Sequence, residues 1–311
     1  MEEILFQLAD ELSLYMRQGQ LRQVLARPMN SDEQGFSGAK LLRLDCTVAD
    51  GNRTTFIAKY TDVKECQVMD TLTVQNRRHT PLTRTDQNRQ GEKAWIVMED
   101  IRSDEPISAN PGLPWKTQVA AALTDIHADN FSAAGKMSRL PHADGSYWKH
   151  ITTKISIDHF ENACKNDPAF SKKYARLLPV LYRRGEQFVK DMTLLYQDGE
   201  SLTLTHGDLQ TISGDHVRCF KGKPVIIDWG FSRYAPFYID LVDFFTKEEA
   251  LIYWEALRSK GILLSKDTFE ECFHRALVYP AFIYMYPALV QYRHGSEGRL
   301  EQILSVLCQD S

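Results

Sequence analysis

The stretch that decides the fold is Thr205-His-Gly-Asp-Leu-Gln-Thr-Ile-Ser213, followed by Pro224-Val-Ile-Ile-Asp-Trp-Gly230 and Tyr238-Ile-Asp-Leu-Val-Asp-Phe-Phe245. It places one carboxylate, Asp208, in a turn and a second, Asp228, at the end of a short β-branched run twenty residues later. This pattern predicts that the fold brings two acidic side chains to one centre. We therefore expect the rest of the chain to be organised around this pair.

The composition is that of a globular protein. The chain is 43% apolar and 25% charged, which is ordinary for a globular protein. Its 311 residues are enough to form two packed units. The formal net charge of −4 lacks the basic footprint of a nucleic-acid binder, so we expect a small-molecule partner and no nucleic acid. Six scattered cysteines without a C-x-x-C pair indicate free thiols rather than a zinc site or a disulfide framework.

The N-terminus and the most apolar run predict a cytoplasmic protein without a membrane segment. Residues 1–10 carry acids where a secretory signal carries positive charge, and their apolar positions recur at helical spacing. The run 276–290 is too short to cross a membrane and is interrupted by Pro280 and Pro287. We expect a monomer or a weak dimer.

The first part of the chain predicts an antiparallel sheet preceded by a helix. Residues 1–27 have apolar positions at helical spacing and end near a proline, which predicts a leading helix. The runs 41–48 and 54–60, separated by an Asp-Gly turn, predict a hairpin. A helical pattern follows over 63–74, and the apolar run 95–98 predicts another strand.

A proline-rich linker predicts the boundary between two lobes. Residues 103–115 contain three prolines and a glycine, so we place the N-terminal lobe at 1–102 and the C-terminal lobe at 103–311. The second lobe is mainly helical, and Pro179 is expected to bend or divide its long pattern over 168–197. The fold class is therefore α+β.

Phosphoryl transfer needs a phosphate cradle, a cation, a metal ligand and a group that orients the acceptor hydroxyl, and the chain offers candidates in that order. Gly35 and Gly38 lack side chains and can let backbone amides approach phosphate, although a plain hairpin turn is the favoured explanation of these two glycines alone. Lys59 ends an apolar strand, where lysine is usually a solvated edge charge. Glu65, at the start of the next helix, can pair with it and orient it; Asp70 is the fallback partner.

The two acids of the opening stretch fit the remaining roles. Asp208 can accept a hydrogen bond from an acceptor hydroxyl and align it for attack. Asp228 can bind Mg²⁺, which prefers hard oxygen ligands. His206 is expected to brace the turn by hydrogen bonding, and Asp240 to hold the same loop through its backbone amides.

The buried strand that opens into the linker is a candidate for binding a purine. Met98, Glu99 and Ile101 would contribute main-chain donors and acceptors to an adenine edge, so their side chains carry little information. Taken in isolation, the run favours an ordinary core strand over a nucleotide hinge.

These residues together resemble the aminoglycoside phosphotransferase and choline kinase family, a branch of the protein-kinase-like fold. The family's catalytic loop H-G-D-x-x-x-x-N is matched by His206-Gly-Asp208, and its metal-binding strand ending in I-D-[WFY]-[GE] by Val225-Ile-Ile-Asp-Trp-Gly230. Further agreement lies in Lys59, Met98–Ile101, Leu123–Ala128 and Asp240. The resemblance spans roughly residues 30 to 245, and the motifs occur in the same order.

The resemblance implies a bilobal protein-kinase-like fold with an antiparallel-sheet N-lobe and a mainly helical C-lobe. It implies Asp208 as catalytic base, Asp228 as magnesium ligand, Lys59 with Glu65 on the phosphates of ATP or GTP, and residues 98–101 as the adenine hinge. The implied activity is transfer of the γ-phosphoryl group to a hydroxyl of a small polar acceptor.

One position departs from the family pattern. The family asparagine, five residues after the catalytic aspartate, falls on Ser213, whose hydroxyl is shorter and a weaker metal ligand. A second metal would then be lost, bridged by water, or bound by a neighbour such as Asp215 or His216. Three alternatives follow: an active kinase with altered metal demand, a slow kinase, or a nucleotide-binding protein without catalysis.

The acceptor stays open at the level of the sequence. An aminoglycoside-like acceptor would make the chain an antibiotic-resistance enzyme and would use helical acids such as Glu248, Glu249, Glu270 and Glu271, although such acids usually form a solvated face. A choline-type acceptor would use an aromatic cage, for which the candidates are Tyr234, Phe237, Tyr238, Tyr253 and Trp254, although aromatics at this spacing are usually core. A homoserine-type acceptor is a further alternative. A protein kinase is disfavoured because the chain lacks an H-R-D loop and a long activation segment.

Overall fold

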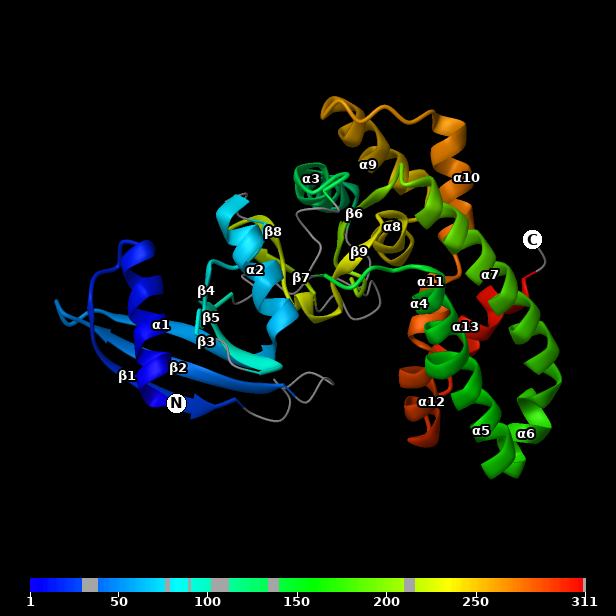
Figure 1. The fold of residues 1–311 in the computed structure, drawn as a ribbon. Helices are drawn as coiled ribbons and strands as arrows, with labels where there is room; N and C mark the ends of the chain where they lie inside the picture. Colours follow the sequence, from blue (N-terminus) through cyan, green and yellow to red (C-terminus); the bar gives the residue numbers. More distant parts are fainter. Residues whose placement is uncertain are drawn as a thin grey trace. The chain divides into compact units, whose positions relative to one another are not determined.

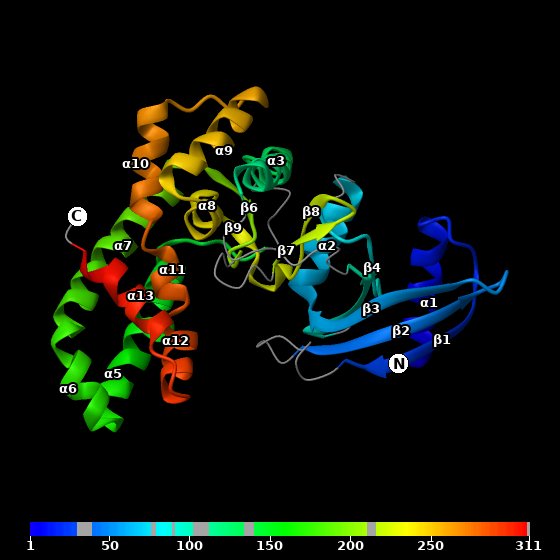
Figure 2. The ribbon, with the colours of Figure 1, turned by 180° about the vertical axis from the view of Figure 1, so that it is seen from behind.

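The computed structural model describes residues 1–29, 39–75, 79–88, 91–101, 112–133, 140–209 and 216–309. The chain forms two compact units, each made of two segments (Figures 1 and 2). The first unit is Met1–Asp129 with Ile212–Ser232, and the second is Asn130–Thr211 with Arg233–Ser311. The boundary expected between residues 102 and 103 lies outside the described residues and stays a prediction.

A five-stranded antiparallel sheet forms the centre of the first unit (Figure 1). Its order is β1-β2-β3-β5-β4, with the bounds Leu21–Pro28, Lys40–Val48, Arg53–Asp62, Lys93–Glu99 and Thr83–Thr85 respectively. The predicted hairpin is present as β2 and β3, and the predicted apolar strand as β5. Residues of β2 alternate between buried and partly exposed, as expected of a sheet with one covered face.

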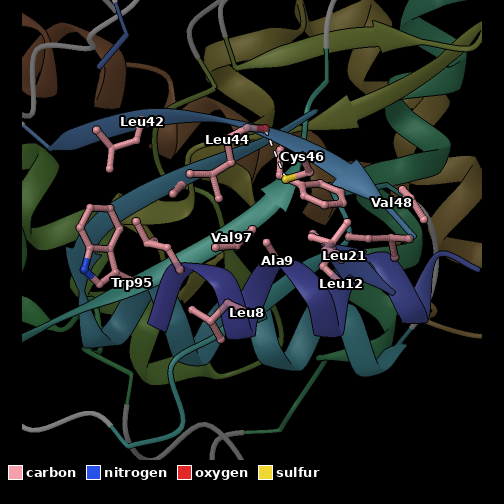
Figure 3. Close-up of a cluster of buried hydrophobic side chains, with 14 residues drawn as sticks. Leu8, Ala9, Leu12, Leu21, Leu42, Leu44, Cys46, Val48, Trp95 and Val97 are labelled. Atoms are coloured by element: carbon pink, nitrogen blue, oxygen red, sulfur yellow. Dashed lines mark hydrogen bonds between the residues drawn. The ribbon is translucent and has the colours of Figure 1, made fainter. Parts of the chain in front are cut away.

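Helix α1, Glu2–Tyr15, covers one face of this sheet (Figure 3). Its side chains Leu8 and Leu12 lie against Leu44 and Val97 of the sheet, and all four are nearly inaccessible to solvent. Burial of this apolar surface is the main stabilising contribution that the helix can make to the unit.

The prediction of a continuous helix over residues 1–27 was wrong. The helix ends at Tyr15, Arg17 adopts a left-handed φ of 60°, and Leu21–Pro28 form β1, paired antiparallel with β2. The apolar residues of β1 recur at three- and four-residue spacing, which imitates a helix, but most of the strand is exposed at the sheet edge. Pairing with β2 therefore outweighs the local pattern, and Pro28 is tolerated because the strand is an edge strand.

The rest of the first unit carries two helices and a small hairpin. Helix α2, Val63–Gln75, follows β3 as predicted, and α3, Leu113–Asp129, contacts β8. Strands β7, Val217–Phe220, and β8, Lys223–Ile226, pair through a two-residue turn with positive φ at both positions, as the right-handed twist of a hairpin requires. The strand predicted before Asp228 is thus present.

The second unit is helical apart from strands β6, Leu202–Thr205, and β9, Arg233–Pro236, which pair antiparallel. Its helical elements are α4 Gly145–His150, a π-helix Ile151–Ile157, α5 Asp158–Asn166, α6 Pro168–Tyr174, a 3-10 turn Ala175–Leu177, α7 Leu178–Asp198, α8 Tyr238–Phe244, α9 Lys247–Ser259, α10 Lys266–Ala276, α11 Tyr279–Ile283, α12 Met285–Arg293 and α13 Gly298–Cys308. The pattern over 168–197 is divided as predicted, with Pro179 in the first turn of α7.

The predicted fold class, α+β with an antiparallel sheet followed by a helical region, is confirmed. All six cysteines are free thiols, as expected. Among the described residues, no helix combines the length and the apolar character needed to cross a membrane.

Candidate active site

Lys59 is the centre of a buried charge cluster in the first unit. Its side chain leaves β3, and its Nζ atom lies 2.8 Å from Glu65 Oε1 on α2 and 2.7 Å from Asp228 Oδ1 after β8. Lys59 and Glu65 are only 7% and 3% exposed. Thr61 also donates a hydrogen bond to Glu65 Oε2. The pairing predicted between Lys59 and Glu65 is therefore formed.

The neighbouring carboxylates keep Lys59 charged despite its burial. Burial alone lowers the pKa of an ammonium group, but Glu65 and then Asp228 favour the charged form, and the pKa of Lys59 is raised from its ordinary value of 10.5. The alternative partner Asp70 accepts a hydrogen bond from Thr85 instead. The structure thus holds a cation in a fixed position at the sheet.

Asp228 lies on strained backbone immediately after β8. Its φ of 63° and ψ of 66° are left-handed, a conformation uncommon outside glycine, asparagine and aspartate. The turn is held from both sides, because Trp229 Nε1 donates to the Ile226 carbonyl and Ser232 Oγ to the Trp229 carbonyl. Gly230 follows, and a Cβ atom there would lie 3.4 Å from Glu65 Oε2. The sequence Asp-Trp-Gly therefore fits a turn that packs closely against Glu65.

The surroundings of Asp228 fit a magnesium ligand. Its side chain is 36% exposed, and its Oδ2 atom lies 3.8 Å from His216 Nε2. Mg²⁺ usually takes one or two protein carboxylates and completes its shell with water and phosphate oxygens. Among the described residues no group of three or more His, Cys, Asp or Glu side chains could hold a metal. Ser213, the second predicted ligand, lies outside the described residues.

The turn His206–Asp208 is built in the second unit at the end of β6. Asp240, in the first turn of α8, accepts hydrogen bonds from the backbone amides of His206 at 2.8 Å and Gly207 at 2.7 Å. His206 Nδ1 in turn accepts from the Asp208 amide at 3.2 Å. Gly207 has a φ of 79°, a backbone conformation in which a residue with a side chain would be strained. The bracing contacts expected of Asp240 and His206 are present.

Two tyrosines and a second aspartate surround Asp208, and the sequence did not single them out. Tyr284 Oη lies 2.8 Å from Asp208 Oδ1 and 2.6 Å from Asp243 Oδ2, and Tyr279 Oη donates to the Gly207 carbonyl at 2.7 Å. The tyrosines follow the turn by more than 70 residues within an apolar run that predicted only a buried helix. The available signal was the spacing of Asp240 and Asp243, which places both on one side of a helix.

The positive charge of Arg233 lies close to Tyr147, near the turn that carries Asp208. The guanidinium group of Arg233 stacks on the Tyr147 ring, with Cζ 3.8 Å from the ring centroid. Burial raises the pKa of Tyr147, and the nearby Arg233 partly offsets that rise. Tyr147 therefore stays a neutral phenol near the turn that carries Asp208.

The structure does not test the nucleotide-binding role predicted for residues outside the Lys59 cluster. Glu99 ends β5 and is 7% exposed, and its amide donates to the Leu82 carbonyl, while Met98 pairs with Ile57 and Thr83 across the sheet. Gly35 and Gly38 lie outside the described residues. The hinge role of Met98, Glu99 and Ile101 stays a prediction.

Most acceptor-binding candidates have structural partners. Glu249 closes a capping box with Thr246, Glu270 pairs with Lys247, and Glu271 pairs with Arg275. The proposed aromatic cage is largely core, since four of its members are at most 1% exposed: Tyr234, Phe237, Tyr238 and Tyr253. Neither set therefore distinguishes between the acceptors.

No family model and no curated protein matches the sequence. Solved structures do match it, at low sequence identity. A choline kinase from Cryptosporidium parvum has a TM-score of 0.60 at 12% identity, covering 91% of this chain and 88% of that one. A spectinomycin phosphotransferase in complex with ADP and spectinomycin has a TM-score of 0.57 at 13% identity, covering 97% and 93%. The chain has their fold. A Plasmodium vivax ethanolamine kinase matches similarly, with a TM-score of 0.55 at 12% identity over 91% and 80%. The resemblance indicated by the motifs is thus confirmed for the fold.

Proposed function

We propose that the chain is an O-phosphotransferase that moves the γ-phosphoryl group of ATP or GTP to a hydroxyl of a small polar acceptor. The observation that carries this proposal is the buried Lys59, held by Glu65 and Asp228, in a chain with the fold of small-molecule kinases. An ammonium fixed by two carboxylates of different elements is suited to binding polyphosphate.

Each group has a defined part in the proposed reaction. Lys59 would bind phosphate oxygens of the nucleotide, with Glu65 setting its direction, while Gly35 and Gly38 would supply backbone amides. Asp228 would hold Mg²⁺, which supplies charge neutralisation for the phosphates when bound. Asp208 would accept the hydrogen bond of the acceptor hydroxyl and orient its oxygen for in-line attack.

We propose an aminoglycoside-like alcohol as the first acceptor class to test, with choline and homoserine as alternatives. The structural neighbours are named for spectinomycin, choline and ethanolamine, which share a hydroxyl group and differ in size. We therefore propose only that the acceptor carries a hydroxyl group, and the turnover experiment below identifies the rest of the molecule.

Ser213 favours a second candidate function, a nucleotide-binding protein with weak or no catalysis. The family asparagine offers an amide oxygen to a metal, whereas a serine hydroxyl reaches less far. Replacement of Ser213 by asparagine is expected to lower the magnesium concentration at half-maximal turnover. An unchanged or higher requirement in a magnesium titration would show that Ser213 does not occupy the place of the missing ligand.

The two functions separate in a turnover experiment. ADP or GDP release is measured with Mg²⁺ and a panel of aminoglycosides, choline, homoserine and sugars, for the parent and for Asp208→Ala. Asp198→Ala is the matched control, because Asp198 is exposed at the end of α7. We expect acceptor-dependent release by the parent and by the control, and a loss of at least about 100-fold in Asp208→Ala. Equal inertness of the parent and Asp208→Ala, with nucleotide still bound, would support the second function.

A further inference from the structure

Asp208, Tyr284 and Asp243 form a buried row of hydrogen-bonding groups in the second unit. Asp208 comes from the turn after β6, Asp243 from α8, and Tyr284 from the junction of α11 and α12. Their exposed fractions are 8%, 5% and 7%. The phenolic oxygen of Tyr284 is within hydrogen-bond distance of both carboxyl groups, at 2.8 Å from Asp208 and 2.6 Å from Asp243.

The number of protons limits how this row can be bonded. A phenol carries one proton and can donate to only one of two carboxyl groups. If both aspartates were ionised, no proton would lie between the phenolic oxygen and one of the two carboxylates. Lone pairs of the two oxygens would then face each other in a site with little water, which is unfavourable in free energy. The phenol keeps its own proton, because burial, then Asp243 and Asp208, raise the pKa of Tyr284 well above its ordinary value. The second hydrogen bond therefore requires a proton on one of the carboxyl groups.

We infer that Asp243 is a protonated carboxylic acid that donates to Tyr284, and that Tyr284 donates to an ionised Asp208. The choice between the two aspartates rests on the proposed function, since a hydroxyl-orienting Asp208 must be ionised to accept the hydrogen bond of the acceptor. The presence of one carboxyl proton in the row is inferred from the two distances, the burial of the three groups and the proton that the phenol keeps. Tyr284 and Asp243 are then positioning residues, which act on the acceptor through Asp208.

Charged groups of both signs lie near the row. The guanidinium group of Arg299 on α13 lies 4.9 Å from the centroid of the Tyr284 ring. Other ionisable groups close to this region are the phenols of Tyr279 on α11 and Tyr147 on α4, the guanidinium group of Arg233 on β9 and the carboxyl group of Asp240 on α8. A fixed donor on one oxygen of Asp208 sets the orientation of the whole carboxylate.

Infrared difference spectroscopy of the full chain tests the proton directly and requires no turnover. Spectra at neutral pH are compared for the parent, Asp243→Asn, Asp208→Asn, Tyr284→Phe and the control Tyr286→Phe, a residue that is 43% exposed. We expect the carbonyl band of a buried carboxylic acid in the parent and in Tyr286→Phe, and its loss in Asp243→Asn. Absence of the band from the parent, or its loss in Asp208→Asn while Asp243→Asn keeps it, would overturn the assignment.

The pH profile of kcat/KM tests the positioning role. An asparagine at 243 can still donate to Tyr284, so Asp243→Asn should keep kcat/KM within about 3-fold and leave the acid limb in place. Tyr284→Phe and Asp243→Leu should lower it by about 10- to 100-fold, and in Tyr284→Phe the acid limb should move to higher pH because the ionised carboxylate loses a donor. An acid limb that moves to lower pH in Asp243→Asn would mean that Asp243 is ionised in the parent, and it would refute the inference.

The two experiments also separate this inference from the proposed function. A parent that is inert with every acceptor but shows the Asp243 band would refute the kinase proposal and support the proton assignment. A parent that is active but lacks the band would support the kinase proposal and refute the proton assignment. Thermal unfolding of each variant identifies loss of the fold, and Asp243→Asn provides the test if Tyr284→Phe unfolds.

Discussion

At the scale of single residues, Asp228 combines an unfavourable backbone conformation with a charged contact in the first unit. Asp228 combines left-handed backbone, which costs an L residue about 1–2 kcal/mol, with a carboxylate brought to the Nζ atom of a buried lysine. Such strain persists only where the surroundings fix the residue, and here the contacts of Trp229 and Ser232 with the turn do so. The position is therefore suited to holding a ligand with little rearrangement.

Glu65→Gln is expected to weaken both the fold and nucleotide binding. It removes the charge that pairs with Lys59 at 2.8 Å in a buried site, so we expect a loss of about 2 kcal/mol in the free energy of unfolding and a several-fold rise in the Kd for nucleotide. Urea unfolding and calorimetric titration measure the two effects.

The matched control is Glu161→Gln, which breaks an exposed pair between Glu161 and Lys165. Exposed pairs of this spacing contribute about 0.5 kcal/mol or less, so stability and nucleotide affinity should barely change. If both variants lost the same stability and neither changed nucleotide affinity, the special role given to the Glu65–Lys59 pair would be wrong.

At the scale of elements, helix α8 fixes the turn that carries Asp208. The start of a helix attracts negative charge, and Asp240 uses that position to accept two backbone amides of the turn. The same helix supplies Asp243 one turn later, on the side that faces Tyr284. One short element thus sets both the backbone of the turn and the hydrogen bonding of its carboxylate.

Asp240→Asn should lower kcat while leaving the fold intact. An amide can accept through only one oxygen and presents N–H groups to the other backbone amide, so at least one of the two hydrogen bonds is lost. A hydrogen bond to a charged group contributes about 1.5–3 kcal/mol, which corresponds to roughly 10- to 100-fold in rate if the whole loss falls on the transition state. Steady-state kinetics against Asp198→Asn measure it, and a variant with unchanged kcat would show that the turn does not depend on this contact.

Helix α1 should contribute to the stability of the first unit through one face only. Leu12 is fully buried against the sheet, whereas Leu14 is 52% exposed on the same helix. Leu12→Ala is expected to cost about 2–5 kcal/mol and Leu14→Ala less than about 0.5 kcal/mol. Denaturant unfolding of both variants checks this, and similar losses would contradict the packing of α1.

At the scale of the whole molecule, the sequence predicts elements best where pattern and packing agree. The β2–β3 hairpin, α2 and β5 follow from alternation, an Asp-Gly turn and helical spacing, and the Lys59–Glu65 pair follows from their order. Strand β1 was mistaken for helix, because an exposed edge strand needs no alternation and its register depends on β2. The contact between Tyr284 and Asp208 could not be predicted from the sequence, because the two residues are 76 positions apart and local sequence patterns carry no information on such contacts.

The proposed chemistry draws on both compact units. Lys59, Glu65 and Asp228 belong to the first, and Asp208 and its bracing residues to the second. In the proposed reaction, side chains of the first unit bind the nucleotide and Asp208 of the second unit orients the acceptor hydroxyl.

Mass spectrometry of the acceptors tests the central claim most directly. Each acceptor is incubated with the parent or with Asp208→Asn, in the presence of Mg²⁺ and ATP or GTP. We expect at least one acceptor to gain a single phosphoryl group with the parent, and no acceptor to gain one with Asp208→Asn in the same time. If nucleotide binds to the parent and no acceptor gains mass, or if Asp208→Asn phosphorylates as fast as the parent, the assignment of Asp208 to the acceptor hydroxyl is contradicted.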